Sequence, residues 1–148
     1  MMTFRLILAA AAFAALAACS PGATTKTEPA AAPDPAATVA RGKYLVDNIG
    51  LCGDCHTQRL PTGMLDSAHY LEGATLVFKP SNPQPWAPTT PALAGLPKGY
   101  DEAQFVRFLQ TNVKPDGSRP LPPMPEYKLS EEDATAIAAY LKGLPPAP

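Results

Sequence analysis

The 148-residue chain is poor in charge, in aromatic residues and in cysteine. Only 17% of its residues are charged and 7% are aromatic, and 12 basic groups oppose 13 acidic ones, for a formal net charge of −1. There is no basic stripe, which makes nucleic acid and anionic membrane surfaces poor candidate partners. The chain also lacks internal repeats, which argues against a repeat architecture.

The chain has only three cysteines, Cys19, Cys52 and Cys55, and two of them form the motif Cys52-Gly53-Asp54-Cys55-His56. This spacing is typical of covalent c-type haem attachment, in which the thiols add to the two vinyl groups and the next imidazole binds the iron. A redox-active disulfide is the alternative, but such sites normally follow a strand in a βαβ unit, and no such pattern is evident. The motif therefore predicts one covalent haem c with His56 as proximal ligand.

The N-terminus reads as a secretory signal over residues 1–18. Arg5 provides the basic start, and the apolar run Leu6–Ala17 is too short to span a bilayer. The run ends in Leu-Ala-Ala-Cys at Cys19, which resembles the bacterial lipoprotein signal, where that cysteine is lipidated. An ordinary cleavable signal with a coincidental cysteine is the alternative. Lipidation leaves no cysteine over, and Ser20 after the cysteine favours delivery to the outer membrane.

The composition changes at residue 34. Residues 19–33 consist mainly of Ala, Pro and Thr without a large apolar side chain, so they predict a flexible tether between lipid and domain. Residues 34–148 are long enough for one small domain, particularly with a haem as part of its core.

Three helices are predicted in this domain. The first begins at Asp34-Pro35, a good N-cap followed by proline at the first helical position, and Gly50 ends it in a left-handed conformation. Glycine costs helix propensity in mid-helix, and we expect Gly42 to allow close contact with the last helix. The expected buried face of this helix consists of Val39, Gly42, Val46 and Ile49.

The other two helices carry clear caps. One runs from about Asp101 to Asn112, with Gln104 paired to the Asp101 cap and Phe105, Phe108 and Leu109 facing inward. The last begins at Ser130, paired with Asp133, and ends before Pro145-Pro146, with an apolar stripe of Ile137, Tyr140, Leu141 and Leu144. Between Leu60 and Gly99 the chain is proline-rich, no segment alternates like a strand, and a short helix near Ser67 to Glu72 is a candidate.

The iron's sixth ligand has three candidates, Met124, Met64 and His69. Met124 lies in Pro120-Leu121-Pro122-Pro123-Met124-Pro125-Glu126-Tyr127, where prolines fix the backbone on both sides, and it is the predicted ligand. A thioether ligand favours Fe(II) and raises the potential. For Met64 an apolar contact at the haem edge is the better interpretation, and for His69 a polar surface role.

Several segments together resemble a class I cytochrome c, and more narrowly the cytochrome c modules of bacterial membrane-bound alcohol and gluconate dehydrogenases. The similarity covers roughly Thr38 to Pro146. It is carried by Arg41-Gly42-Lys43-Tyr44-Leu45, Cys52 to Thr57, Met124-Pro125, Leu129 to Asp133, and Ala139-Tyr140-Leu141 to Pro145-Pro146.

The resemblance implies an all-α, cytochrome c-like fold. Its first and last helices would cross, with Gly42 and Tyr140 at the contact, and its loops would wrap a covalent haem. Trp86 and Arg119 are candidate donors to the haem propionates. The subfamily usually has three haem modules where this chain has one, and its usual Asn-x-Thr-Pro element is replaced by Pro88-Thr89-Thr90-Pro91.

The expected function is electron transfer by a monohaem carrier, not enzymatic turnover. Such a carrier would be a lipoprotein in the bacterial periplasm, anchored to a membrane, and would exchange electrons with redox partner proteins. A dedicated cytochrome subunit of a periplasmic dehydrogenase or oxidase is the first alternative. A five-coordinate haem enzyme or gas sensor is the second, and it requires that Met124 does not bind iron.

Overall fold

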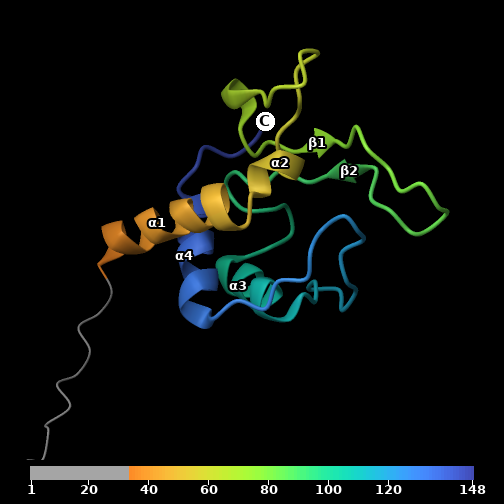
Figure 1. Cartoon of the computed structure of the whole chain (residues 1–148). Helices are drawn as coiled ribbons and strands as arrows, with labels where there is room; N and C mark the ends of the chain where they lie inside the picture. Colours follow the sequence, from red (N-terminus) through yellow and green to blue (C-terminus); the bar gives the residue numbers. More distant parts are fainter. Residues whose placement is uncertain (1–33) are drawn as a thin grey trace, which may run out of the picture. The chain divides into compact units, whose positions relative to one another are not determined.

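The computed structural model describes residues 34–148. The predicted signal peptide and tether, including Cys19, lie outside the described residues. The elements in chain order are α1 (Pro35–Tyr44), the π-helix η1 (Leu45–Ile49), α2 (Cys52–His56), the 3-10 helix η2 (Ser67–His69), β1 (Ala74–Thr75), β2 (Thr89–Thr90), α3 (Glu102–Thr111) and α4 (Glu131–Lys142) (Figure 1). None of the helices in residues 34–148 is long and apolar enough to cross a membrane.

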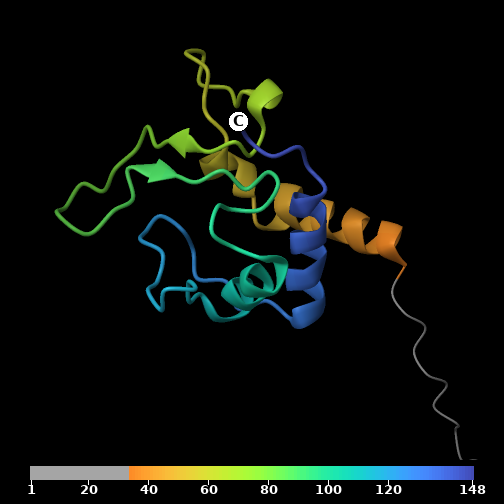
Figure 2. The ribbon, with the colours of Figure 1, turned by 180° about the vertical axis from the view of Figure 1, so that it is seen from behind.

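Helices α1 and α4 cross in close contact, as both ribbon views show (Figures 1 and 2). Gly42 is buried at the crossing, where an added Cβ would overlap the carbonyl group of Ala136 and lie 2.9 Å from Cβ of Tyr140. Only glycine fits between the two backbones, so the prediction for Gly42 is confirmed.

The start of α1 is as predicted and its end is not. Asp34 accepts a hydrogen bond from the Ala36 amide as the N-cap. The chain then continues into the π-helix through Ile49, and Gly50 has φ −80°, so the predicted left-handed Gly50 is wrong. Leu51, with φ 48°, adopts that conformation instead.

The predicted buried face of the first helix is only half right. Gly42 and Val46 are buried, whereas Val39 is exposed and Ile49 is 60% exposed. The wider turn of the π-helix shifts the side-chain positions after Tyr44, which brings Leu45 into the core and leaves Ile49 outside.

The caps of α3 and α4 are confirmed. Asp101 and Gln104 form a full capping box, and the Ser130 hydroxyl accepts from the Asp133 amide. Helix α3 packs on α4, and the core they share includes the predicted inward residues. Those residues are Phe105, Phe108 and Leu109 from α3 and Ile137, Tyr140 and Leu141 from α4. Leu144, the fourth residue of the predicted stripe, lies beyond the end of α4 and is only partly buried.

The expectation that the segment from Leu60 to Gly99 has no strand is wrong. Strands β1 and β2 pair antiparallel, with Ala74 opposite Thr90 and Thr75 opposite Thr89. Two residues per strand are too few to produce a readable alternation. Most of the buried core comes from helices, but Leu71, Leu93 and Ala94 add to it from loops, so the all-α prediction holds only in part. Residues 76–88 extend beyond the ladder as a projecting loop (Figure 2). The short helix expected near Ser67 is present as a single 3-10 turn.

Candidate haem site

Helix α2 presents the two thiols of the motif. Cys52 and Cys55 are not joined in a disulfide. Burial is the main cause that raises the pKa of Cys52 to about 11, and burial also raises the pKa of Cys55. A redox-active C-x-x-C site needs a thiol with a lowered pKa. Neither thiol therefore has the lowered pKa that is typical of a redox-active C-x-x-C site.

His56 is buried, with 5% of its surface exposed, and its ring orientation is fixed. Its Nδ1 lies 2.8 Å from the carbonyl oxygen of Pro91. A carbonyl can only accept, so Nδ1 carries the hydrogen and Nε2 keeps the lone pair that a metal requires. Burial lowers the pKa of His56, although the hydrogen bond to Pro91 opposes this. The ring is therefore neutral at pH 7, as iron ligation needs.

The segments around β1 and β2 form hydrogen bonds with the backbone of α2. The Thr90 hydroxyl donates to the Cys55 carbonyl oxygen at 2.7 Å and accepts from the Ala74 amide at 3.1 Å. The Gly73 amide donates to the His56 carbonyl oxygen at 2.8 Å. The part played by Pro91 and Thr90 did not follow from the sequence. A backbone carbonyl is present in every residue type, so the sequence does not mark Pro91 as the acceptor for His56. The only hint in the sequence was that Pro88-Thr89-Thr90-Pro91 replaces the Asn-x-Thr-Pro element of the subfamily.

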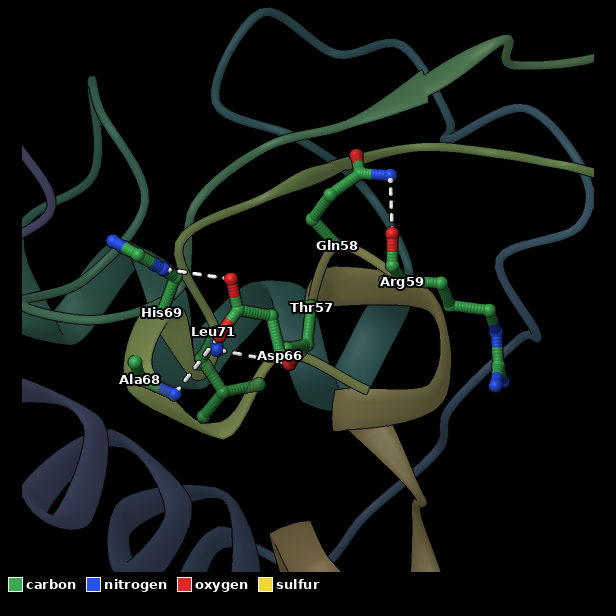
Figure 3. A network of polar contacts seen from close by, with 7 residues as sticks. All are labelled: Thr57, Gln58, Arg59, Asp66, Ala68, His69 and Leu71. Atoms are coloured by element: carbon green, nitrogen blue, oxygen red, sulfur yellow. Dashed lines mark hydrogen bonds and ion pairs between the residues drawn. The ribbon is translucent and has the colours of Figure 1, made fainter. Parts of the chain in front are cut away.

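A polar network orders the chain that follows α2 (Figure 3). The buried Thr57 hydroxyl accepts from the Leu71 amide at 3.0 Å. Further along, Asp66 accepts from the Ala68 amide and contacts Nδ1 of His69 at 2.8 Å. His69 is therefore already engaged by a carboxylate on an exposed turn.

Met124 and Met64 occupy different surroundings. Met124 is partly buried and packs against the hydrophobic core, whereas Met64 is 70% exposed. The loop around Met124 is tied to other segments at two points. The Ala87 amide donates to the Pro122 carbonyl oxygen at 2.8 Å, and the Tyr127 hydroxyl donates to the Gly50 carbonyl oxygen at 3.0 Å.

The two candidate propionate donors also differ. Nε1 of Trp86 is buried without a hydrogen-bond partner, and its ring meets Phe78 edge to face at 6.0 Å between centroids. A buried donor without an acceptor is costly, and a carboxylate beside it would remove that cost. The Arg119 side chain is exposed and lies 3.7 Å from Glu126. Trp86 thus has the unmet need that a haem propionate would satisfy.

The donor set as a whole fits a covalent haem. It combines two unpaired thiols, a neutral imidazole with a free Nε2, a thioether in a fixed loop, and an indole N–H that lacks an acceptor. Thioether linkages and a histidine–methionine pair of axial ligands use these groups.

Comparisons with known proteins agree with this set. The cytochrome c family matches residues 39–145. The chain is 32% identical over 110 residues to a diheme cytochrome c-type protein of Cereibacter sphaeroides, covering 71% of this chain and 35% of that protein. It is 34% identical over 125 residues to the gluconate 2-dehydrogenase cytochrome c subunit of Pantoea cypripedii, covering 79% of this chain and 28% of the subunit.

A third relative is the fructose dehydrogenase cytochrome subunit of Gluconobacter japonicus. It is 32% identical over 115 residues, which cover 71% of this chain and 22% of that subunit. The chain therefore spans between 22% and 35% of the length of each of these three relatives. Because the family match extends over most of the sequence and includes the two thiols, His56 and Met124, the chain belongs to the cytochrome c family.

Proposed function

We propose that the chain is an electron-transfer protein with one haem c, joined through Cys52 and Cys55 and ligated by His56 and Met124. When bound, the haem supplies a one-electron Fe(III)/Fe(II) couple. The observation that supports this best is the His56–Pro91 hydrogen bond, which leaves Nε2 available on the same short helix that carries two free thiols. On this proposal the chain passes electrons and does not turn over a substrate.

Each side chain has a separate task in this proposal. The thiols of Cys52 and Cys55 fix the porphyrin, and His56 keeps its imidazole neutral and oriented through Pro91. Met124 contributes a neutral thioether, which favours the reduced iron and keeps external ligands away. Trp86 donates its buried N–H to a propionate. Arg119, more exposed, is a weaker second donor to the propionates.

Met124 is preferred to the other two candidate ligands because of its surroundings. It packs against the core in a loop tied to Gly50 and Ala87, close in the chain to the cap of α4. Met64 is largely exposed, and His69 is engaged with Asp66. If Met124 binds the iron, Met64 can stay exposed and His69 can keep its contact with Asp66.

The test of this assignment is the spectrum of the holoprotein, made with a haem-attachment system. Met124→Ala should keep covalent haem after denaturation, lose the Met-to-Fe(III) charge-transfer band, lower the potential and bind carbon monoxide. Met64→Leu is the matched control and should change none of these. An unchanged band in Met124→Ala would assign the ligand elsewhere, and a colourless sample would refute the haem itself.

The cellular setting proposed for this carrier is the bacterial periplasm. Lipidation at Cys19 after removal of residues 1–18 would anchor the domain to a membrane, with the outer membrane favoured by Ser20, and residues 19–33 would be the tether. A tethered head raises its local concentration for any redox partner at that membrane. Cys19→Ala should move the haem-stained band from the membrane to the soluble periplasmic fraction, and a band that stays in the membrane contradicts the anchor.

The second candidate function is a cytochrome subunit of a dehydrogenase complex. It is favoured by the names of two relatives, which are subunits of a gluconate and a fructose dehydrogenase. Affinity purification from membranes separates the two functions. A dehydrogenase that co-purifies at constant ratio in moderate salt supports the subunit, whereas isolation of the cytochrome alone supports the free carrier.

A further inference from the structure

Asp47 lies at the centre of a polar cluster that the electron-transfer proposal does not use. The Tyr70 hydroxyl donates to Asp47 Oδ1 at 2.5 Å, and the Lys43 ammonium group pairs with Oδ2. The Asp47 side chain is only 23% exposed, whereas that of Lys43 is 61% exposed. Both carboxylate oxygens of Asp47 thus have a partner, and the Asp47 carboxylate is less exposed to solvent than the Lys43 ammonium group that pairs with it.

The local backbone brings this cluster to the haem-attachment helix. Asp47 is the middle residue of the π-helix Leu45–Ile49, which leads directly to α2. Its partner Tyr70 packs against Gly53, between the two cysteines, where an added Cβ would lie 2.6 Å from the Tyr70 ring. A π-turn inside a helix often occurs at a functional position.

The charge of Asp47 acts on the groups around it. Burial is the main cause that raises the pKa of the Cys52 thiol to about 11, and the charge of Asp47 raises it further. The pKa of Tyr70 is also raised, first by burial and then by its hydrogen bond to Asp47. Solvent screens a partly buried charge less than an exposed one. Tyr70, which holds the Asp47 carboxylate, also packs against Gly53 between the two cysteines, so only one side chain separates this charge from the attachment helix.

We infer that Asp47 sets the reduction potential of the haem through its negative charge. Reduction adds one electron to the iron and lowers the positive charge at the centre by one. A fixed carboxylate nearby favours the more positive Fe(III) form and so lowers the potential, while Lys43 partly offsets it. Tyr70 holds the carboxylate in place. This inference rests on the proposed function, because it requires a haem on Cys52.

A purely structural role for Asp47 makes a different prediction. In that role the residue only ties the π-helix to the loop that carries Tyr70, and the potential would depend on the tie and not on the charge. Asp47→Asn separates the two, since it keeps a carbonyl acceptor for the Tyr70 hydroxyl and removes the charge. Tyr70→Phe does the reverse: it keeps the charge and breaks the tie.

The experiment is a redox titration of the full-length holoprotein and its variants. At the midpoint potential of the unmodified protein, Asp47→Asn should raise the ratio of reduced to oxidised haem several-fold. A tenfold change in that ratio corresponds to about 59 mV for a one-electron couple. Lys43→Gln should lower the ratio by a smaller factor. Glu102→Gln removes an equal charge from the ion pair between Glu102 of α3 and Lys142 of α4, and it should leave the ratio unchanged.

Three results would overturn the inference. These are an unchanged midpoint in Asp47→Asn, a shift matched by Glu102→Gln, or a rise in Tyr70→Phe equal to that in Asp47→Asn. If Asp47→Asn does not fold, the downward shift in Lys43→Gln decides the matter, and its absence counts against the charge. A sample without haem has no midpoint and refutes the proposed function, whereas a normal His/Met spectrum with unmoved midpoints refutes only the role of Asp47.

Discussion

The two sides of the candidate haem site are held in different ways. On the histidine side, α2 is hydrogen-bonded to three separate positions: the Gly73 amide and the Thr90 hydroxyl donate to its carbonyl oxygens, and the Pro91 carbonyl oxygen accepts from His56. On the other side, the methionine loop (Pro120–Tyr127) has four prolines among eight residues. Proline has no amide hydrogen, so this loop has few backbone donors, and its rigidity comes from fixed φ angles.

This difference predicts unequal responses of the two iron ligands. Opening the histidine side breaks several partly buried hydrogen bonds together, whereas the methionine loop has only a few hydrogen bonds to the rest of the domain. Regions with few buried contacts open at lower free-energy cost. We therefore expect His56 to stay bound in conditions that already release Met124.

The largest expected effect comes from His56→Ala. Loss of the fixed imidazole should stop the holoprotein from accumulating, because no nearby group can replace a ring oriented by Pro91. Haem-stained band intensity divided by immunoblot intensity measures this, with Met124→Ala as the counterpart that still accumulates. If His56→Ala and Met124→Ala lose holoprotein to the same extent, the histidine and methionine sides do not differ in the way proposed.

The next effect comes from Thr90→Val, which keeps the shape of the side chain and removes its hydroxyl. Two hydrogen bonds to the backbone of Cys55 and Ala74 are lost, at a cost of about 1–3 kcal/mol in the free energy of unfolding. Urea unfolding of the holoprotein measures this loss. Thr89→Val, at the exposed neighbouring position, should cost much less.

Pro125→Ala probes the methionine loop in the same way. Because the ring acts mainly by restricting the chain, the free energy of unfolding should fall by less than about 1 kcal/mol. The rate at which added imidazole replaces the Met124 thioether should rise, since the loop opens more often. A stopped-flow spectrum records this rate, and a variant as slow as the unmodified protein shows that proline does not hold the ligand.

The smallest effect concerns the exposed turn after α2. The hydrogen bond to Asp66 is the main cause that raises the pKa of His69, and the same bond lowers the pKa of Asp66. The stabilisation from a raised histidine pKa is present below the unfolded value and is lost as the pH rises through the folded one. In an NMR titration, the pKa of His69 should be higher in the unmodified protein than in Asp66→Asn. The haem spectra of the two proteins should be the same.

The features that could be predicted from the sequence are local ones. The caps at Asp34, Asp101 and Ser130 each join a side chain to an amide two or three residues away, so a short window contains both partners. The motif around His56 is equally local. Gly42 was also predictable, because a glycine inside a helix with a clear N-cap needs a reason.

The features that could not be predicted depend on distant partners or on the backbone alone. The acceptor for His56 is a carbonyl 35 residues away, and any residue type at that position has one. Tyr70 and Asp47 are 23 residues apart, with no periodicity to connect them. The left-handed Leu51 arises where the π-helix meets α2, since leucine itself disfavours that conformation.

The π-helix between Gly42 and Cys52 has a consequence for related chains of different length. A π-turn contains one residue more than an α-turn, so it absorbs an insertion without displacing the segments on either side. Removing one residue from Leu45–Ile49 should convert it to an ordinary α-turn and leave the helix crossing and the attachment motif at their present spacing. Sequence alignments of such domains should therefore place single-residue gaps at this turn.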